Sequence, residues 1–436
     1  MTFIINLVDQ AVMYLWIIAS VLFFVVGLYF TIKTKFVQMR GFKKSIQYLV
    51  GYDSTNDDKN SVSPFEAFFA SVGGAVGIGN IAGICAAVKY GGPGAVFWVW
   101  VTAFLGILLK YNEVYLAMIT RRKNKDGSYS GGPMMVFETL FNNKLLAYVQ
   151  AILLSLYSIE IYQFSIAKQS IVRNWNISAQ YEPLVVIVFL VLILLVVRGG
   201  VKSVGRVSQY IIPIFVLVFF MMSAYVLIIN ISKLPVVLYN IIVTAFVPSA
   251  ALGGVIGVSV GEAVKIGVQR ACYAADVGIG YTSIIHSQTS ETDPKKQASL
   301  TFASIFIDLF GVCTLSMVLV LVGLTPLEIQ TISHESYIDF LFHQYFPYMH
   351  IFMPIFYCLL GFSTITAFYT VGLSCASYIH HHGRTCFHIV AVCSFLYFSR
   401  YESDLSYQIM AIIGALLLII NVISYTVVSN RIDHNL

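Results

Sequence analysis

The feature that most limits the fold of this chain is a series of apolar runs, each long enough to cross a lipid bilayer as a helix. A membrane-spanning helix needs about 20 consecutive apolar residues, and such runs recur along most of the 436 residues. The chain is 58% hydrophobic and 11% charged, with a mean hydropathy of +0.81, whereas about a quarter of the residues in soluble domains are charged. The sequence therefore predicts an all-α polytopic membrane protein. It excludes a water-soluble enzyme, a nucleic-acid-binding module and a disordered adaptor.

The hydropathy pattern predicts eleven membrane crossings. The first run has no basic segment before it and no small-residue cleavage site, so it is interpreted as a retained span. The seventh is too long for one straight helix, and either two short helices or one interrupted helix would explain its length. The predicted spans are 11–32, 64–88, 94–119, 145–170, 183–197, 208–231, 240–285, 298–324, 346–380, 385–399 and 407–430.

The distribution of basic residues predicts the orientation. If the N-terminus lies outside, eighteen of the 26 Lys and Arg residues fall in inner loops or the C-terminal tail, four fall outside and four lie within spans. Loops rich in Lys and Arg remain in the cytoplasm. The expected location is therefore the plasma membrane, or the inner membrane of a bacterium, with a cytoplasmic C-terminus. The seven cysteines show no paired spacing and are expected to be free thiols.

The second predicted span contains five glycines within eleven residues, namely Gly73, Gly74, Gly77, Gly79 and Gly83. Each glycine costs about 1 kcal/mol relative to alanine inside a helix, so little free energy opposes local unwinding. One interpretation is close packing of helices through small residues. The other is a discontinuous helix whose freed carbonyl groups line a cavity and bind an ion and a zwitterion. Asn80 would add a side-chain oxygen there.

A second group of helix breakers lies in the long seventh segment, at Pro248, Gly253, Gly254, Gly257 and Gly261. Two glycine-broken segments separated by five spans are typical of inverted-repeat transporters, whose binding site lies between the repeats. Residues 1–436 are therefore predicted to form one transporter domain. It would contain an extra N-terminal helix at 11–32, a first five-helix repeat at 64–231 and a second at 240–430.

Several motifs, in the same order along the chain, resemble the alanine or glycine:cation symporter family, whose members share the LeuT-type fold of five plus five helices. The most specific is GGPGAVFW at residues 91–98. The others are VGIGNIAG at 76–83, WVTAF at 100–104, GGPM at 131–134, RGG at 198–200, IFID at 305–308 and FSTI at 362–365.

This resemblance implies sodium-driven symport of a small neutral amino acid, alanine or glycine, by alternating access. Sodium prefers several oxygen ligands, and a neutral set of carbonyl and hydroxyl groups can release it again. The implied sodium ligands are Gly73, Val76, Ser363 and Thr364, and the implied substrate-binding residues are Ala75, Gly77, Gly79, Asn80, Gly254 and Phe368. Asn80 and Ala75 are implied either at the substrate carboxylate or at a second sodium. The expected partners are the amino acid, the transported Na⁺ (or H⁺ in its place) and membrane lipid, with a monomer favoured and no nucleic acid.

The expected pocket departs from the family pattern more than the scaffold does. Departures occur at Ile78, Ala274, Ala275, Phe368 and Leu373, and a glutamine usual in the fourth span is interpreted as replaced near Ala167. They leave open a different substrate, an uncoupled or proton-coupled carrier, and a channel-like facilitator. An intramembrane enzyme is not expected, because no nucleophile and base stand at a credible spacing.

Charged side chains at the centre of a membrane cost at least about 2.5–3.5 kcal/mol each, so they are expected to have partners. Asp308 is the acid most closely linked to ion coupling, either by binding a cation or proton or, alternatively, by hydrogen bonding a neighbouring helix end. The expected structural pairs are Lys110 with Glu113, Arg270 with Asp276, and Glu262 with Lys265.

Two further motifs are interpreted as unrelated to function. The run GVSVG at 257–261 matches a nucleophile pattern but lies in an apolar helical segment without a surrounding sheet. A histidine cluster could bind a metal, but solvated histidines in a basic inner loop are the favoured interpretation. Its members are His380, His381, His382 and His388.

Overall fold

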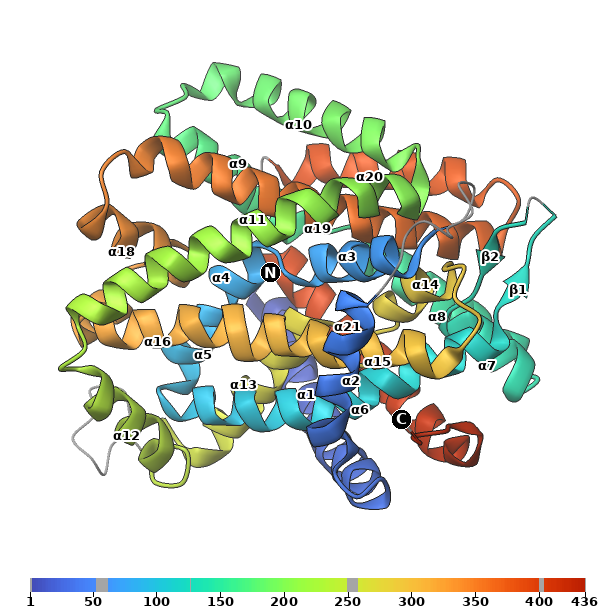
Figure 1. The fold of residues 1–436 in the computed structure, drawn as a ribbon. Helices are drawn as coiled ribbons and strands as arrows, with labels where there is room; N and C mark the ends of the chain where they lie inside the picture. The colour runs from blue at the N-terminus through green and yellow to red at the C-terminus, as the bar shows by residue number, and fades with distance from the viewer. Residues whose placement is uncertain (1, 52–61, 126, 249–257, 400–403, 436) are drawn as a thin grey trace.

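The computed structural model describes residues 2–51, 62–125, 127–248, 258–399 and 404–435, and these are almost entirely helical (Figure 1). Within these ranges the only strands are β1 (Arg122–Lys123) and β2 (Tyr129–Ser130), which pair antiparallel. Apolar runs form helices because lipid offers the backbone no hydrogen-bond partners, so each segment must satisfy its own polar groups. The predicted all-α membrane fold is confirmed.

Eight helical segments of the described residues are long and apolar enough to cross a membrane, and one bent pair of helices raises the number to nine. The prediction of eleven exceeds this number by two. The extra segments are 240–285 and 385–399, whose helices are shorter, and their crossing of the membrane stays a prediction. The eight segments are Gln10–Lys33, Gly94–Thr120, Lys144–Asn174, Ala179–Val197, Gly200–Ile229, Pro294–Gly323, Met349–Ile379 and Gln408–Val427.

The long helices run in similar directions across the view of Figure 1, while α1 is steeply inclined to them. Helix α11 packs on α3 and α19, α6 packs on α13 and α15, and α1 packs on α21. Their bounds are α1 (Thr2–Lys33), α3 (Pro64–Ala75), α6 (Gly94–Thr120), α8 (Lys144–Tyr157), α9 (Ile161–Asn174), α10 (Glu182–Val197), α11 (Gly200–Ile229), α13 (Val260–Ala275), α15 (Pro294–Ile305), α16 (Thr314–Gly323), α19 (Met349–Ile379), α20 (Gly383–Phe398) and α21 (Asp404–Val427).

Shorter helices connect these elements. They are α2 (Val37–Val50), α7 (Pro133–Leu140), α12 (Leu234–Thr244), α17 (Pro326–Thr331) and α18 (Tyr337–Tyr345), with 3-10 turns η3 (Ala179–Tyr181), η6 (His334–Ser336) and η7 (Ser429–Arg431).

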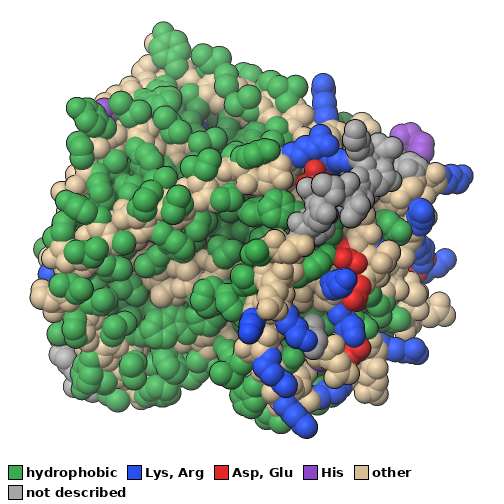
Figure 2. All heavy atoms as spheres, viewed as in Figure 1, with side chains coloured by type: hydrophobic (Ala, Val, Ile, Leu, Met, Phe, Trp, Pro, Cys, Tyr) green, Lys and Arg blue, Asp and Glu red, His purple; other side chains and the backbone are tan. Residues whose placement is uncertain are grey.

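Charge and apolar surface are separated on the face shown in Figure 2. Hydrophobic side chains cover most of it, and Lys and Arg side chains gather at the right-hand end, where Figure 1 places β1, β2 and α7. Large apolar side chains are exposed on α10, such as Leu184, Ile187 and Leu195. An apolar surface with charge at one end is the surface that a bilayer-embedded protein presents to lipid and to the adjacent water.

The first predicted break is present. Helix α3 ends at Ala75, and the chain continues through α4 (Ile78–Ile81), η2 (Gly83–Cys85) and α5 (Ala86–Gly91), with a bend of 55° between the two halves. Between them Gly77 is fully extended, with φ −125° and ψ −164°. The break therefore falls within the glycine cluster, as the low helix propensity of glycine predicts.

The seventh segment is interrupted at one predicted breaker, since α12 ends at Thr244 and Pro248 lies outside a helix. The second break of the structure lies further along the same segment, between α13 and α14 (Tyr281–Ser287), where Asp276, Gly278 and Gly280 have positive φ angles of 50°, 75° and 105°. Glycine tolerates this left-handed region and aspartate does so better than most residues. Of the predicted breakers, Gly253, Gly254 and Gly257 lie outside the described residues, and Gly261 lies inside α13.

The start of α13 explains the GVSVG motif and corrects one predicted ion pair. The Ser259 hydroxyl accepts a hydrogen bond from the Glu262 backbone N–H at 3.2 Å, and the Glu262 carboxylate accepts one from the Ser259 N–H at 3.2 Å. This reciprocal arrangement is a capping box. The expected pairing of Glu262 with Lys265 is therefore wrong, because the carboxylate turns back to the first turn of its own helix.

Two further irregularities were not predicted. The fourth span is interrupted at residues 158–160, between α8 and α9, and the eighth contains a π-helical stretch, η5 (Phe306–Cys313), between α15 and α16. π-Helical turns often occur at functional sites because they shift side chains relative to the regular helix. Both irregularities lie beside the first break, since α4 contacts α9 and η5.

Candidate functional site

A small cavity lies where the two broken helices meet α9 and α19. The volume that the centre of a water molecule can occupy in this cavity is about 10 Å³, which is room for one water molecule. An amino acid therefore does not fit unless the surrounding helices separate. The lining residues are Gly74, Ala75, Gly79, Asn80, Glu160, Gln163, Tyr273, Ala274, Asp276, Thr364 and Phe368.

Asn80 connects the two breaks. Its Oδ1 accepts a hydrogen bond from the Gly77 N–H at 3.0 Å, which closes the turn of the first break. Its Nδ2 donates to the Ala274 carbonyl at 3.1 Å, at the end of α13, and to the Asp308 carboxylate in η5. One buried amide group thus holds together three elements that are far apart in the sequence.

Three of the four predicted sodium ligands lie together. The Thr364 hydroxyl donates to the Gly73 carbonyl at 3.3 Å, and the Ser363 hydroxyl lies 3.0 Å from the Ser208 hydroxyl. A methyl group on Gly73 would lie 2.6 Å from the Ser363 oxygen and 2.7 Å from the Ser208 oxygen. The space beside Gly73 is therefore occupied by hydroxyl oxygens. Val76, the fourth predicted ligand, directly follows the last residue of α3, and its backbone is not helical.

Ser208 on α11 was not predicted for this site. It is buried, and it contributes a hydroxyl directly beside the predicted pair. A serine in a membrane helix more often hydrogen bonds to the preceding turn of that helix, so its residue type alone carried no signal of this role.

Glycines of the first break allow close approach of α9 and α19. The Gly79 N–H donates to the Gln163 Oε1 at 3.3 Å, and a methyl group on Gly77 would lie 2.2 Å from the Thr364 hydroxyl oxygen. The fourth span therefore does supply a glutamine to the cavity, at Gln163, one helical turn before Ala167. The replacement of the family's usual glutamine near Ala167 stays a prediction.

Aromatic side chains close one side of the cavity. The ring of Phe368 stacks on that of Tyr281, with 4.0 Å between centroids and 17° between planes. The Tyr281 hydroxyl donates to the Ala70 carbonyl in α3 at 3.0 Å. Phe368 thus lies at the predicted pocket, and Tyr281 couples it to the first broken helix. Leu373 is buried further along α19, and the predicted residue Gly254 lies outside the described residues.

The expected pair of Lys110 and Glu113 is not formed. The Lys110 ammonium donates to the Ala275 carbonyl at 2.7 Å, at the end of α13. Glu113 accepts hydrogen bonds from the Ser283 N–H at 3.2 Å and the Tyr425 hydroxyl at 3.4 Å. The two side chains leave the same helix turn but stabilise opposite sides of the second break. The spacing indicated one helix face and did not reveal these tertiary partners.

The expected pair of Arg270 and Asp276 is also wrong. Asp276 accepts a hydrogen bond from the Tyr157 hydroxyl at 3.3 Å, and its charge interacts with that of Lys110. The Arg270 charge lies instead near His334, in the segment before α18. Burial, together with the positive charges of Arg270 and Lys89, lowers the pKa of His334 from 6.5 to about 3. Residue 276 follows the end of α13 and has a left-handed backbone conformation. Its side chain therefore does not continue the helical face that carries Arg270.

Asp308, the predicted coupling residue, lies in the π-helical stretch η5 and is 1% exposed. One carboxylate oxygen accepts from Asn80, with the Cys313 thiol 3.5 Å away. The other, Oδ2, is buried without a hydrogen-bond partner among the described residues. The structure thus places an incompletely satisfied acid behind the first break.

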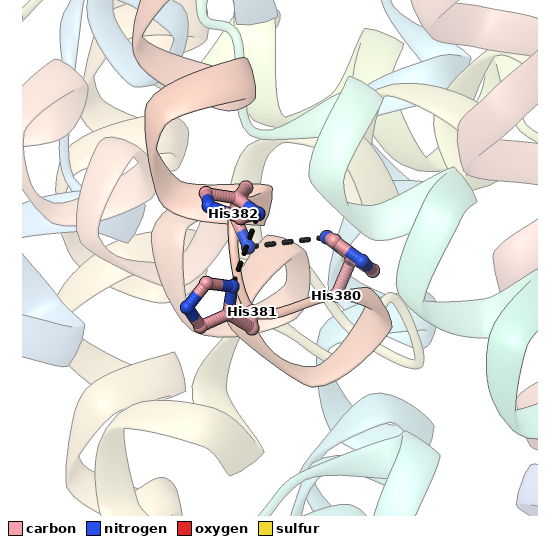
Figure 3. A group of neighbouring side chains, drawn as sticks. All are labelled: His380, His381 and His382. Atoms are coloured by element: carbon pink, nitrogen blue, oxygen red, sulfur yellow. Dashed lines mark hydrogen bonds between the residues drawn. The ribbon is translucent and has the colours of Figure 1, made fainter.

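The histidine cluster lies apart from this cavity, at the end of α19 (Figure 3). His380, His381 and His382 are exposed, and their ring nitrogens lie within 4.8 Å of one another. His388 does not belong to this group. Its Nδ1 forms a hydrogen bond with the Tyr369 hydroxyl at 2.8 Å. The exposure agrees with the interpretation of the three as solvated residues. All seven cysteines are free, as expected.

Comparison with known proteins gives consistent results. The model of the sodium:alanine symporter family matches residues 1–436. An uncharacterized transporter of Haemophilus influenzae is 33% identical over 68% of this chain and 65% of its own length, so the chain spans slightly less than two thirds of that relative. The sodium/alanine symporter AgcS of Methanococcus maripaludis is 26% identical over 81% of this chain and 78% of its own length.

A solved structure shows a related fold. The nucleobase-cation-symport-1 family transporter Mhp1, in a closed conformation, aligns with a TM-score of 0.53 over 87% of this chain and 82% of its own length. The sequences are 14% identical, so this likeness concerns the fold alone. The predicted fold class and the predicted family are confirmed.

Proposed function

This chain belongs to the sodium:alanine symporter family, and on that premise we propose that it is a secondary transporter that couples the entry of sodium to the uptake of an amino acid. The observation that carries the proposal is the group of oxygens formed by the Gly73 carbonyl and the hydroxyls of Ser208, Ser363 and Thr364. They come from α3, α11 and α19, so an ion bound among them would link the first break to its neighbours.

The chemistry of this group suits sodium. Sodium is a hard cation that prefers carbonyl and hydroxyl oxygens to sulfur or imidazole. All the donors are uncharged, so the ion is held without a carboxylate and is released again inside the cell. Val76 belongs to this proposal as a further carbonyl ligand. It directly follows α3, so no later turn of that helix supplies an N–H group to its carbonyl.

The amino acid is proposed to bind in the adjacent cavity. Ala75, Gly77 and Gly79 offer backbone groups of the unwound turn, Asn80 offers its amide, and Phe368 covers the non-polar side. Non-helical backbone is tolerated at membrane depth only where it is buried in protein or lines a cavity. The role assigned to Gly254 stays a prediction.

The transport cycle would open this cavity to each side in turn. The cavity has room for about one water molecule, so the structure corresponds to a closed conformation. In this proposal the first repeat at 64–231 rocks against the second at 240–430, while helix 11–32 remains outside the repeats. The end rich in Lys and Arg in Figure 2 would face the cytoplasm, with the N-terminus outside.

Sodium coupling supplies enough free energy for accumulation. One positive charge moving inward across 100 mV contributes about 2.3 kcal/mol, which corresponds to roughly a fifty-fold concentration ratio at about 1.4 kcal/mol per factor of ten. Proton coupling is the second candidate, and the specific observation in its favour is the unsatisfied Oδ2 of Asp308.

The proposal is tested with the purified full chain in liposomes. Uptake of labelled alanine and of the other amino acids is followed with an inward sodium gradient, with potassium in its place, and with an inward proton gradient. We expect uptake that depends on sodium. Uptake that follows the proton gradient alone would select the second candidate, and uptake indifferent to both gradients would contradict coupled transport.

A further inference from the structure

Glu160 is a buried acid of the cavity that the proposed sodium and substrate roles do not use. It lies in the interruption between α8 and α9, is 3% exposed and lines the cavity with Gln163. Although it stands directly before α9, its side chain makes no capping hydrogen bond to that helix. Its Oε2 is buried without a hydrogen-bond partner among the described residues.

The cavity holds a second acid and lacks a cationic side chain. Asp276 lines it too and is near enough to Glu160 for their charges to interact. The described lining residues include no Lys, Arg or His. No cationic group of the described residues lies within 4.0 Å of the Glu160 carboxylate, whereas Glu113, Asp276 and Asp308 share Lys110.

Lys110 does not compensate Glu160. Its ammonium is held by the Ala275 carbonyl at 2.7 Å, behind the second break, and its charge acts on Asp276, Asp308 and Glu113. One ammonium group therefore faces three acids, and Glu160 is a fourth without a counter-charge. An isolated carboxylate in such surroundings is strongly unfavourable unless a cation or a hydrogen-bond donor joins it or it takes up a proton.

A neutral amino acid does not repair this imbalance. It brings one ammonium group but also one carboxylate, so it adds no net charge to a cavity that already contains two acids. A substrate with an additional ammonium or guanidinium group does add a positive charge.

We propose that Glu160 binds the cationic side chain of the substrate, so that this transporter favours an amino acid with a positively charged side chain. The inference rests on the proposed function, because it names the substrate class of the same cavity. It replaces the expectation of alanine or glycine, which came from the resemblance to the family. Glu160 is a specificity-determining residue in this scheme, and sodium remains bound at Gly73.

The test compares two amino acids that differ in charge. L-lysine and L-norleucine share a four-carbon side chain, and only lysine ends in an ammonium group. Sodium-driven uptake of each, and of alanine, is measured for the full chain in liposomes. We expect lysine to be taken up at least ten-fold better than norleucine, and the Glu160→Gln variant to reduce this ratio at least ten-fold.

Control variants separate charge from structure. Glu160→Asp keeps the carboxylate and should retain the preference for lysine. Glu328→Gln makes the same chemical change in the exposed capping box of α17, a position at which glutamine can form the same capping hydrogen bond as glutamate. It should leave the uptake of lysine and of norleucine unchanged. The thermal stability of each purified variant shows whether it is folded. Should Glu160→Gln fail this check, the wild-type ratio and Glu160→Asp decide the question.

Three outcomes would overturn the inference. The first is sodium-driven uptake of alanine or norleucine that exceeds uptake of lysine in the wild type, which leaves the proposed function intact. The second is an equal loss of lysine and norleucine uptake in Glu160→Gln, which assigns Glu160 to the common α-ammonium group. The third is the absence of sodium-driven uptake for all twenty amino acids, which removes the proposed function as well.

Discussion

Replacing Gly73 by alanine tests the proposed sodium site most directly. The added methyl group would lie 2.6 Å from the Ser363 oxygen, 2.7 Å from the Ser208 oxygen and 2.9 Å from the Ser208 Cβ. Contacts between a methyl carbon and these atoms need more than 3.4 Å, so at least one hydroxyl must move out of the oxygen group. The substitution therefore changes the ligands without removing any of their side chains.

The expected magnitude follows from the loss of one ligand. A polar contact to a charged group contributes about 1.5–3 kcal/mol, and about 1.4 kcal/mol corresponds to a factor of ten in an equilibrium constant. Gly73→Ala should thus raise the sodium concentration for half-maximal uptake about ten-fold to a hundred-fold. The same shift should appear in the stabilisation of the purified protein by sodium, because a ligand that binds only the folded state raises the melting temperature.

The matched control is Gly261→Ala on α13. A methyl group there meets no atom within 4 Å among the described residues, and the backbone is helical, so the substitution adds the same atoms in open space. Its sodium dependence should equal that of the wild type. A Gly73→Ala protein that is folded and keeps the wild-type sodium dependence would refute the placement of the ion at these oxygens.

Four other predictions concern the same region. Thr364→Ala should raise the half-maximal sodium concentration several-fold in uptake assays, whereas Thr364→Ser, which keeps the hydroxyl, should stay near the wild type. Asn80→Ala removes the contacts to Gly77 and Ala274 and should abolish substrate-induced thermal stabilisation, so a wild-type response would exclude Asn80 from the site. Asp308→Asn should preserve sodium-driven uptake if sodium alone is coupled, and a loss of pH dependence in this variant would indicate a proton carried by Asp308. Gly205→Ala would place a methyl group 2.5 Å from the Glu66 carbonyl oxygen between α11 and α3 and should destabilise the protein by about 1–3 kcal/mol through overpacking, measured as a lower melting temperature against Gly261→Ala.

The sequence predicted the elements whose cause is local. Apolar length predicts spans, and clustered glycines predict a weak point in a helix, so the first break was found within the expected residues. In the seventh segment Pro248 lies outside a helix, as expected of a helix breaker, after α12 ends at Thr244. The break at Asp276, Gly278 and Gly280 was missed because its signal is a single left-handed aspartate followed by two glycines. Local propensity therefore identified the interrupted segment and one of its interruptions.

The partners of charged residues were predicted poorly for a related reason. Spacing along one helix suggests pairs within that helix, such as Lys110 with Glu113. Both side chains instead reach the second broken helix, where the break leaves carbonyl and N–H groups free to form hydrogen bonds with them. Such groups exist only once the break is formed, so the sequence of α6 alone contains no sign of them. Ser208 and Glu160 were missed in the same way, because their roles depend on which helices meet.

The contacts at the two breaks also suggest how binding and movement are linked. Asn80 in the first broken helix holds the Ala274 carbonyl at the end of α13, and Lys110 holds the next carbonyl, that of Ala275. Opening the cavity by separating the first break from α13 must therefore break the Asn80 contact, while the Lys110 contact can move with α6 and α13, which pack together. A substrate that takes over the hydrogen bonds of Asn80 would offset this loss. Opening would then depend on whether the cavity is occupied, which is the condition that a coupled carrier needs and an open pore does not.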